Sequence, residues 1–490
     1  MKLSKLLTNI DYKLIQGSTE IEVENICWDS RNIKKSSLFI CVKGKNVDRH
    51  SFANDAIEKG AIALVIEHDI ENIPKHVTVV KVNDSKSSMA VIANDFFDHP
   101  SEKFKLVGIT GTNGKTSTSY FLTELLQSFD KNTGLIGTIE NKIGDKKLDL
   151  EKKNPTTPDS LDLQSCFYKM VEGGVTHVVM EATSIGLVNH RVDECDFDIG
   201  IFTNLTQDHL DEHGTMENYR DAKIKLFKMC KKGLINIDDY YAEDFIKAAE
   251  CEVFTYGIDR PADYRAEDVA YSLEGSTFTL NYHGQKKEVS IKVSGKFNVY
   301  NSLAAIAACH QLGFPLDTII ENISSIHTVS GRFQTIPNCK GYMVVVDYAH
   351  TPDGIENILN SARNITKKKV ISVFGCGGDR DKTKRPIMGQ IAGKLSDYCV
   401  LTSDNPRTEE PEGIIKDIEK GIKATACPYI IEADRKKAIF MALEKSRPGD
   451  IIVIAGKGHE TYQIFKDKTI HFDDVEVVKE YLKLTSYVFK

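Results

Sequence analysis

The sequence has 490 residues, of which 41% are hydrophobic and 27% charged, as in ordinary folded proteins rather than disordered ones. A chain of this length is too long for one hydrophobic core, and we expect about three domains. The formal net charge of -7 argues against a nucleic acid as the main partner, because binding a phosphate backbone requires clustered Lys and Arg.

Cysteine usage and hydropathy indicate the compartment. The eleven cysteines are an odd number and form no C-x-x-C pair, which predicts reduced thiols rather than disulfides or a zinc site. Residues 1–13 lack the continuous apolar core of a signal peptide. No uncharged apolar stretch approaches the roughly 18 residues that a membrane span needs. We therefore expect a cytoplasmic protein without a membrane span.

Residues 1–100 are predicted to form a small N-terminal α/β domain. Its apolar runs fall at 37–42, 62–66 and 77–82, and its helical pattern falls at 51–59. It contains no phosphate loop. The cluster Trp28-Asp29-Ser30-Arg31 could hold a base or a sugar, and the alternative is an ordinary surface turn.

A glycine-rich stretch, T-G-T-N-G-K-T over residues 110–116, lies between a predicted buried strand (104–109) and a predicted helix (119–129). Gly111 and Gly114 would let the backbone wrap around phosphate oxygens, with amide groups and the positive helix end facing the anion. The arrangement predicts a site for a nucleoside triphosphate.

Two side chains of this stretch carry the chemistry. Lys115 would reach the outer phosphates, and the Thr116 hydroxyl could bind Mg²⁺. The general spacing of phosphate loops has a glycine at the position that Ile109 occupies here. The alternative is therefore a glycine turn in front of an ordinary α/β helix.

Residues 101–328 are predicted to form the central domain. Apolar runs alternate with helical patterns, which is typical of a mostly parallel sheet with crossover helices; the runs are 134–139, 177–182, 198–204 and 233–237. Over 271–293 the period changes to two around His283-Gly284, which predicts an antiparallel hairpin.

Polar side chains cluster where these strands end, the edge at which parallel sheets carry function. Glu181 follows one strand, and His209 lies in the dense run Asp208 to His213 after another. Carboxylate and imidazole ligands there suit a Mg²⁺ that carries phosphates. Thr156 and Thr157 lie between prolines in a rigid, donor-rich loop, which could equally be a helix start.

Residues 329–490 are predicted to form a third, Rossmann-like α/β domain with strands at 343–346, 369–374, 398–402 and 451–455. The loop 375–380 is close to a dinucleotide fingerprint, but Arg380 replaces the third glycine, which disfavours NAD. Arg380, Arg407 and Glu460 follow strands. Guanidinium groups bind carboxylates and a glutamate binds an amine, so the set suits an amino-acid substrate; surface ion pairs are the alternative.

Eight runs taken in order resemble the Mur ligase family, the ATP-dependent amide-forming enzymes of peptidoglycan synthesis. They are T-G-T-N-G-K-T, T-N-L-T-Q-D-H-L-D-E-H-G, G-K-F-N-V-Y-N, S-G-R-F, D-Y-A-H-T-P-D, G-C-G-G-D-R-D-K, D-N-P-R-T-E-E-P and G-K-G-H-E. The resemblance implies a central P-loop-type ATPase domain between the other two domains.

The resemblance also assigns roles to residues. It implies catalytic roles for Lys115, Glu181, His209 and Lys223, the last as a lysine carbamylated by CO₂. It implies metal contacts from Thr116, Glu181, His209 and the Lys223 carbamate. The implied ATP contacts are Gly111, Thr112, Asn113, Gly114, Lys115, Thr116, Asn298, Arg332 and Asp347. The implied contacts of a UDP-sugar peptide are Ser30, Thr156, Thr157, Thr183, Asn189 and Arg191.

The incoming amino acid is expected to be meso-diaminopimelate, joined to UDP-MurNAc-dipeptide through an acyl phosphate. The D-N-P-R run resembles the diaminopimelate-adding form, and the implied pocket is Arg380, Asp404, Asn405, Arg407, Gly456 and Glu460. Three positions depart from the family pattern: Arg49 replaces a glycine, Ile185 a histidine and Asn189 a glutamine.

Two kinds of alternative remain open at this point. One is a sister ligase, either lysine-adding or of the folylpolyglutamate type, because specificity within a fold is a small free-energy difference. The other is a P-loop switch that hydrolyses nucleotide to drive a partner, or a non-catalytic nucleotide-binding module. A switch would turn over ATP without a UDP-sugar or an amino acid. We expect the chain to act as a monomer.

Overall fold

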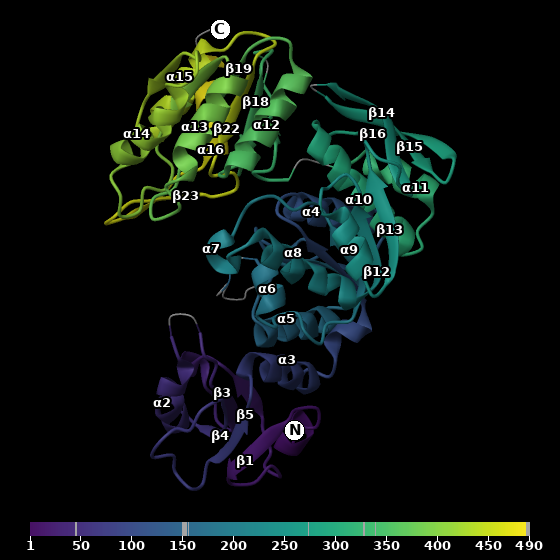
Figure 1. Ribbon diagram of the computed structural model, residues 1–490, viewed down its shortest axis with the longest axis vertical. Coiled ribbons are helices and arrows are strands. Elements are labelled where there is room, and N and C mark those ends of the chain that lie inside the picture. Colours follow the sequence, from purple (N-terminus) through teal and green to yellow (C-terminus); the bar gives the residue numbers. More distant parts are fainter. Residues whose placement is uncertain are drawn as a thin grey trace.

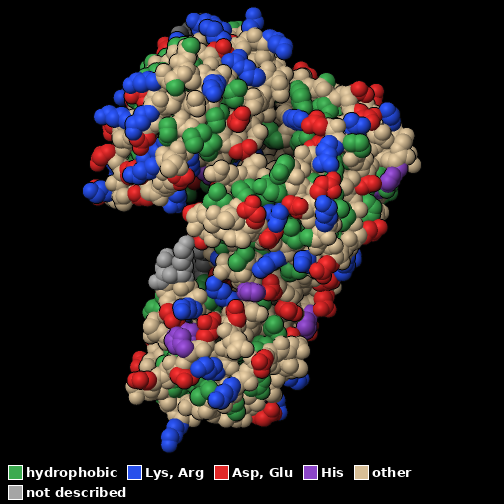
Figure 2. All heavy atoms as spheres, viewed as in Figure 1, with side chains coloured by type: hydrophobic (Ala, Val, Ile, Leu, Met, Phe, Trp, Pro, Cys, Tyr) green, Lys and Arg blue, Asp and Glu red, His purple; other side chains and the backbone are tan. Residues whose placement is uncertain are grey.

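The computed structural model describes residues 1–44, 47–148, 154, 156–272, 274–326, 329–338 and 340–486. Figure 1 shows three units along the long axis of the molecule, with the central unit between the N-terminal and C-terminal ones. Each unit has its own sheet, formed by β1–β5, β6–β16 and β17–β22. Figure 2 shows that one side of the molecule is hollowed between the two terminal units.

The N-terminal sheet has the order β1-β5-β4-β3-β2, parallel except for β1. Its inner strands are buried because α1 and α3 cover one face and α2 covers the other. The elements are α1 (Leu3–Leu6), β1 (Tyr12–Gln16), β2 (Asn25–Cys27), η1 (Ser30–Asn32), β3 (Ser37–Ile40), η2 (Arg49–Phe52), α2 (Ala53–Glu58), β4 (Ala61–Ile66), β5 (Thr78–Val82), α3 (Ser85–Phe96) and η3 (Pro100–Lys103).

The central sheet has the order β16-β15-β14-β13-β12-β11-β6-β10-β7-β8-β9, with a parallel core from β14 to β7 and antiparallel ends. The first half contains β6 (Lys105–Thr110), α4 (Lys115–Ser128), β7 (Thr133–Ile136), β8 (Asn141–Ile143), β9 (Lys146–Lys147), α5 (Ser160–Glu172), β10 (His177–Glu181), α6 (Ser184–Val188), β11 (Phe197–Phe202), α7 (Leu210–His213) and α8 (Met216–Ile224). The second half contains η4 (Lys225–Lys228), β12 (Cys230–Asn236), α9 (Ala242–Ala248), β13 (Glu252–Gly257), β14 (Tyr264–Ser272), β15 (Gly275–Tyr282), β16 (Gln285–Ile291), α10 (Lys296–Gln311) and α11 (Leu316–Ile323).

Two apolar cores hold the central sheet. Residues of α4, α10 and α11 pack on one face, and residues of α5, α8 and α9 pack on the other. Because β6, β10 and β11 lie between these layers, they are mainly apolar and buried; β6 and β10 end in the polar residues Thr110 and Glu181.

The C-terminal sheet has the order β17-β18-β22-β19-β20-β21, parallel except for β17, with helices on both faces. The elements are β17 (Gln334–Ile336), β18 (Met343–Asp347), α12 (Pro352–Ile365), β19 (Val370–Phe374), α13 (Lys384–Leu395), β20 (Tyr398–Leu401), α14 (Pro411–Ile422), β21 (Tyr429–Ile431), α15 (Arg435–Lys445), β22 (Ile451–Ala455), β23 (Tyr462–Ile464), β24 (Thr469–His471) and α16 (Asp474–Ser486).

The predicted mixed α/β class with mostly parallel sheets is confirmed. The predicted hairpin is confirmed as well: β15 and β16 pair antiparallel, with His283 and Gly284 both at positive φ in a two-residue turn. Helix α4 begins at Lys115, four residues before the expected start, because the helix begins directly after the phosphate loop. Within the described residues, no helix is long and apolar enough to cross a membrane.

Candidate active site

The phosphate loop lies at the carboxyl end of β6, between the ends of β10 and β11. In the register of the sheet, Glu181 pairs with Ile109 and Phe202 with Thr110, so polar residues after both strands flank the loop. Gly111 has a φ of +150°, and a Cβ atom there would lie 1.9 Å from the Thr203 hydroxyl. The close approach of the two loops therefore requires glycine at this position.

The neighbouring loop after β11 holds the phosphate loop in place. The Thr112 amide donates to the Asn204 carbonyl at 2.8 Å, and the Asn113 amide donates to the Asn204 side-chain oxygen at 2.9 Å. The Thr203 hydroxyl donates to the Asn113 carbonyl at 2.7 Å. The loop is therefore held by protein contacts with the neighbouring strand end.

Two lysines lie against the carbonyl oxygen of Gly111. Lys115 donates to it at 2.8 Å and to the Thr112 carbonyl at 2.9 Å, and Lys223 of α8 donates to it at 2.9 Å. Burial lowers the pKa of Lys115, and burial together with the nearby Lys115 holds the pKa of Lys223 well below its usual range. Lys223 is also 4.3 Å from the centre of the Tyr219 ring.

Glu181 is fully buried beside the phosphate loop. Its carboxylate accepts hydrogen bonds from the Thr116 hydroxyl at 3.1 Å and from the Thr138 amide and hydroxyl at 2.8 and 2.9 Å. Thr138 in turn contacts the Thr156 hydroxyl at 3.0 Å. The predicted partners Thr116 and Glu181 are thus brought together, and their oxygens are ligands of the kind that Mg²⁺ prefers.

His209 does not join this group in the described structure. It has a positive φ of 52° directly before α7, its side chain is about half exposed, and its ring pairs with Asp208 at 3.5 Å. Its other described contact is an edge contact with Tyr219. A metal contact from His209 therefore stays a prediction.

The residues expected at the UDP-sugar peptide form a second group next to Glu181. The Thr157 hydroxyl donates to the Glu181 carbonyl at 2.9 Å and contacts the Thr183 hydroxyl at the same distance. Arg191 donates to the Thr157 carbonyl at 3.0 Å. Asn189 lies apart from these contacts, because its side chain accepts from Lys86 at 2.7 Å and donates to a carbonyl within its own helix.

Ser30 lies in the N-terminal unit, at the start of η1. Asp29 caps this turn and forms a two-pronged pair with Arg31, with oxygen–nitrogen distances of 2.6 and 3.0 Å. The guanidinium group of Arg49, which replaces the family glycine, lies 4.2 Å from the centre of the Trp28 ring. A planar cation on an aromatic face thus stands near the expected uridine end.

Within the described residues, Asp48, His50 and His68 are the one group with the composition of a metal site. However, the Glu67 amide donates to His50 Nε2 at 2.9 Å, so His50 Nδ1 carries the proton and donates to Asp48 at 2.6 Å. A metal ligand needs a free lone pair at that nitrogen. We interpret the group as hydrogen-bonded side chains and not as a metal centre.

Residues of the C-terminal unit reach the phosphate loop. Arg332 donates to the Thr116 hydroxyl at 3.3 Å, and Asp353, at the start of α12, accepts from Asn113 and from the Thr206 hydroxyl. Burial raises the pKa of Asp353. Sequence reasoning had not singled out Asp353, since an acidic first turn is common in helices.

Two further residues expected at ATP have mainly structural contacts. The carboxylate of Asp347 accepts the amides of Phe333 and Ala349 at 2.6 and 2.8 Å, which fixes the loop that carries Arg332. Asn298, in the first turn of α10, is buried and bonded to the Ser294 carbonyl at 2.9 Å.

The expected amino-acid pocket is assembled at the carboxyl ends of β19, β20 and β22. Asn405 donates to the Glu460 carboxylate at 2.8 Å, and Arg407, at a positive φ of 54°, donates to the Gly378 carbonyl at 2.8 Å. A Cβ at Gly456 would lie 2.4 Å from the Asp404 carboxylate, so these two strand ends touch. Arg380 is exposed, and its described hydrogen bond is to the neighbouring Asp379 carbonyl.

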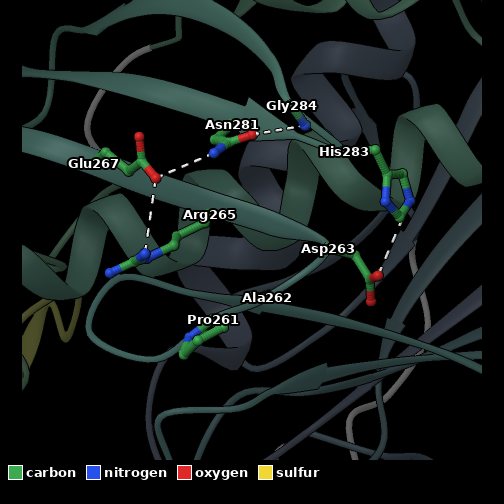
Figure 3. Close-up of a pocket in the computed structure, with 8 residues that line it drawn as sticks. All are labelled: Pro261, Ala262, Asp263, Arg265, Glu267, Asn281, His283 and Gly284. Carbon is green, nitrogen blue, oxygen red and sulfur yellow. Dashed lines mark hydrogen bonds and ion pairs between the residues drawn. The ribbon is translucent and has the colours of Figure 1, made fainter.

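One cavity of about 250 Å³ lies elsewhere, on the antiparallel part of the central sheet. Figure 3 shows that its charged side chains pair with one another, Arg265 with Glu267 and His283 with Asp263. Strand β14 is four strands from β6, which is roughly 19 Å at the usual strand spacing. The cavity is therefore separate from the phosphate loop; it is lined by Pro261, Ala262, Asp263, Arg265, Glu267, Asn281, His283 and Gly284.

Comparison with known proteins places this site in a family. Three family models match the chain: the Mur ligase family catalytic domain over residues 22–97, the Mur ligase middle domain over 109–309, and the Mur ligase glutamate ligase domain over 331–458. The matched ranges contain the phosphate loop, Glu181, Lys223 and Asn405, and the last range ends two residues before Glu460.

Curated relatives match over nearly the whole chain. A protein of Clostridium acetobutylicum named UDP-N-acetylmuramoyl-L-alanyl-D-glutamate--2,6-diaminopimelate ligase 2 is 47% identical, with 98% of this chain and 100% of that protein aligned. A ligase of Caldanaerobacter subterraneus subsp. tengcongensis with the same name, without the final number, is 48% identical over 98% of this chain and 99% of its own length.

Solved structures show the same architecture. A structure of a UDP-N-acetylmuramoyl-L-alanyl-D-glutamate--2,6-diaminopimelate ligase superposes with a TM-score of 0.74 at 32% identity, covering 99% of each chain. The Thermotoga maritima MurF ligase in complex with ADP superposes with a TM-score of 0.65 at 18% identity, covering 94% of this chain and 97% of its own, and supports the fold alone. The chain therefore belongs to the Mur ligase family and is an ATP-dependent amide ligase.

Proposed function

We propose that the enzyme adds meso-diaminopimelate to UDP-N-acetylmuramoyl-L-alanyl-D-glutamate, the reaction named for its relatives. The observation that carries the amino-acid part is the grouping of Asn405 and Arg407, which follow β20, with Glu460, which follows β22; Arg407 also contacts the Gly378 carbonyl after β19. Glu460 offers a carboxylate to an amine, and Arg407 offers a guanidinium to a carboxylate. Diaminopimelate has both groups at its far end, whereas lysine lacks the second carboxylate.

The chemistry follows from charge. The carboxylate of the UDP-linked dipeptide must attack the γ-phosphate of ATP, so two anions must approach each other. Lys115 would offset that repulsion and stabilise the transferring phosphoryl group. The bond between the β- and γ-phosphates breaks and ADP leaves as the acyl phosphate forms. The amine of diaminopimelate would then attack the acyl carbon, which releases phosphate and a proton and leaves an amide.

The ligands near the phosphate loop fit a magnesium ion. The Thr116 hydroxyl and the Glu181 carboxylate are 3.1 Å apart and next to the loop, and we propose that they hold Mg²⁺. When bound, Mg²⁺ supplies positive charge for the phosphate oxygens. We propose His209 as a further ligand, reached by movement of the exposed loop before α7.

We also propose that the amine of Lys223 is modified to a carbamate. Only a neutral amine can attack CO₂, and burial beside Lys115 favours the neutral form of Lys223. The carbamate would replace a cation by an anion at the edge of the phosphate loop.

The remaining assignments are proposals of the same kind. We place the domain boundaries at residues 1–100, 101–328 and 329–490, and we propose that the enzyme acts as a monomer. Both ATP and UDP-linked precursors are cytoplasmic compounds, so the reaction places the enzyme in the cytoplasm.

The test is phosphate release from ATP in the presence of UDP-MurNAc-L-Ala-D-Glu, comparing meso-diaminopimelate with L-lysine. We expect turnover with diaminopimelate and little with lysine. Turnover with lysine alone would keep the family and refute the proposed specificity. Turnover of ATP with neither substrate would instead favour a nucleotide-hydrolysing switch.

A further inference from the structure

Lys457 lies directly beneath the proposed amino-acid pocket, and its side chain is fully buried. Its ammonium group has three acceptors: the Glu460 carboxylate at 3.2 Å, the Asn405 amide oxygen at 3.3 Å and the carbonyl oxygen of Tyr462. A buried ammonium is costly unless it is paired and fully hydrogen-bonded. Here each of its three N–H bonds has an acceptor, so the lysine is stable only in this arrangement.

Two of these acceptors also contact each other. Asn405 donates to Glu460 at 2.8 Å through its amide nitrogen, while its amide oxygen accepts both from Lys457 and from the Ile464 amide at 3.0 Å. The three side chains thus close a triangle in which each fixes the orientation of the other two. In particular, Lys457 and the Ile464 amide together favour the orientation in which the Asn405 amide nitrogen faces Glu460.

A different cation fixes the backbone below. Arg435 donates to both oxygens of Asp474 at 2.8 Å and to the Ala455 carbonyl at 3.0 Å, and all of these groups are buried. The end of β22 is therefore held independently of Lys457. The ammonium of Lys457 contacts the pocket side chains and the start of β23, and not β22, which ends two residues before it.

We propose that Lys457 is a positioning residue for the incoming amino acid. Its ammonium holds Asn405 and Glu460 in the orientation that receives the amine of the substrate, and its charge balances Glu460 when the pocket is empty. The inference rests on the proposed function, because it takes Asn405 and Glu460 as contacts of diaminopimelate.

The first test is Lys457→Met, which keeps the volume of the side chain and removes its charge and donors. We expect the KM for diaminopimelate to rise at least about tenfold, because two pocket side chains lose their charged partner. The KM values for ATP and for the UDP-linked dipeptide should stay within about twofold. Lys466→Met, at an exposed lysine between β23 and β24, is the matched control and should leave all three values unchanged.

A partial reaction separates positioning from loss of structure. Without diaminopimelate, hydroxylamine traps the acyl phosphate as a hydroxamate with release of phosphate, and Lys457→Met should do this at the rate of the unmodified enzyme. Equal rises in all KM values, or an unchanged KM for diaminopimelate, would refute the positioning role. If the Met variant does not fold, Lys457→Arg must show the same selective rise, and an unselective effect refutes the proposal. Failure of the unmodified enzyme to use diaminopimelate would instead refute the proposed function.

Discussion

At the scale of single residues, Lys115 and Lys223 both lie against the carbonyl of Gly111 although each side chain is ordinarily a cation. Two ammonium groups so close in a buried site would repel each other strongly. Burial lowers the pKa of both lysines, and the nearby Lys115 lowers the pKa of Lys223 further, which favours Lys223 as the neutral partner. We propose that the pair divides two tasks, a cation for phosphate and a neutral amine for CO₂.

A dependence on CO₂ follows from this division. In buffer stripped of CO₂ at about pH 7, the rate of ligation should fall and should recover when bicarbonate is added. The dependence should steepen as the pH falls, because protonation of the Lys223 amine withdraws the form that reacts. Lys223→Met should lose about a hundredfold or more of the turnover, whereas Lys225→Met, at an exposed lysine two residues away, should not. A rate independent of CO₂ at every pH would exclude the carbamate.

At the scale of elements, three side chains join the end of β4 to the turn η2. Asp48 contacts His50 at 2.6 Å and His68 at 3.0 Å, and the two rings stack with centres 3.9 Å apart. The hydrogen bond that His68 donates to Asp48 raises the pKa of His68, and the two histidines lower the pKa of Asp48 against the effect of its desolvation. The contact therefore joins two elements by charge as well as by packing.

The pKa directions fix how this contact depends on pH. The contribution of His68 to the free energy of unfolding is fully present below the unfolded pKa of about 6.5. It is lost as the pH rises through the raised pKa of His68 in the folded protein. The Asp48 contribution is present above its unfolded pKa of about 3.9 and is lost as the pH falls through the lowered folded value.

A melting experiment checks this sign. His68→Gln should lower the melting temperature more at pH 6 than at pH 8.5, and the exposed His76→Gln serves as the control. His68 is about half exposed, so the shift should be small. A larger loss at pH 8.5 than at pH 6 would contradict the assignment.

At the scale of the whole molecule, the described part of the C-terminal unit contacts the phosphate loop through Arg332 and Asp353. Arg332 donates to Thr116, and Asp353 accepts from Asn113 and Thr206. Figure 1 shows the C-terminal unit at the far end of the molecule from the N-terminal one. These contacts, together with the packing of Phe297 against Phe333, hold the C-terminal unit against the central one. Closure of this unit would also keep water from the acyl phosphate.

Removing the Asp353 contact should therefore weaken the use of ATP. For Asp353→Ala we expect kcat/KM for ATP to fall about tenfold, since a hydrogen bond to a charged group contributes on the order of 1.5 kcal/mol. Glu356→Ala, at an exposed position on the same helix, is the control. Small-angle scattering of the free variant should show a larger radius of gyration. Unchanged kinetics and shape would mean that Asp353 does not hold the two units together.

The sequence by itself determined the strands, the phosphate loop and the family. The strands β6, β10, β11 and β22 are buried over most or all of their length, and strands of this kind are rich in apolar residues, which makes them visible as runs. The edge strands β1 and β21 and the short pair β23 and β24 were not predicted, because exposed edges carry no apolar pattern.

Only the tertiary structure decided how residues far apart in the chain meet. It joined Glu181 to Thr116 and Thr138, Asp353 to Asn113, and Lys457 to Asn405, through contacts that no local pattern encodes. It also distinguished the two lysines at Gly111 from ordinary surface lysines, because burial lowers the pKa of both side chains. Local sequence fixes what a strand end carries, whereas the order of strands in the sheet fixes which strand ends become neighbours.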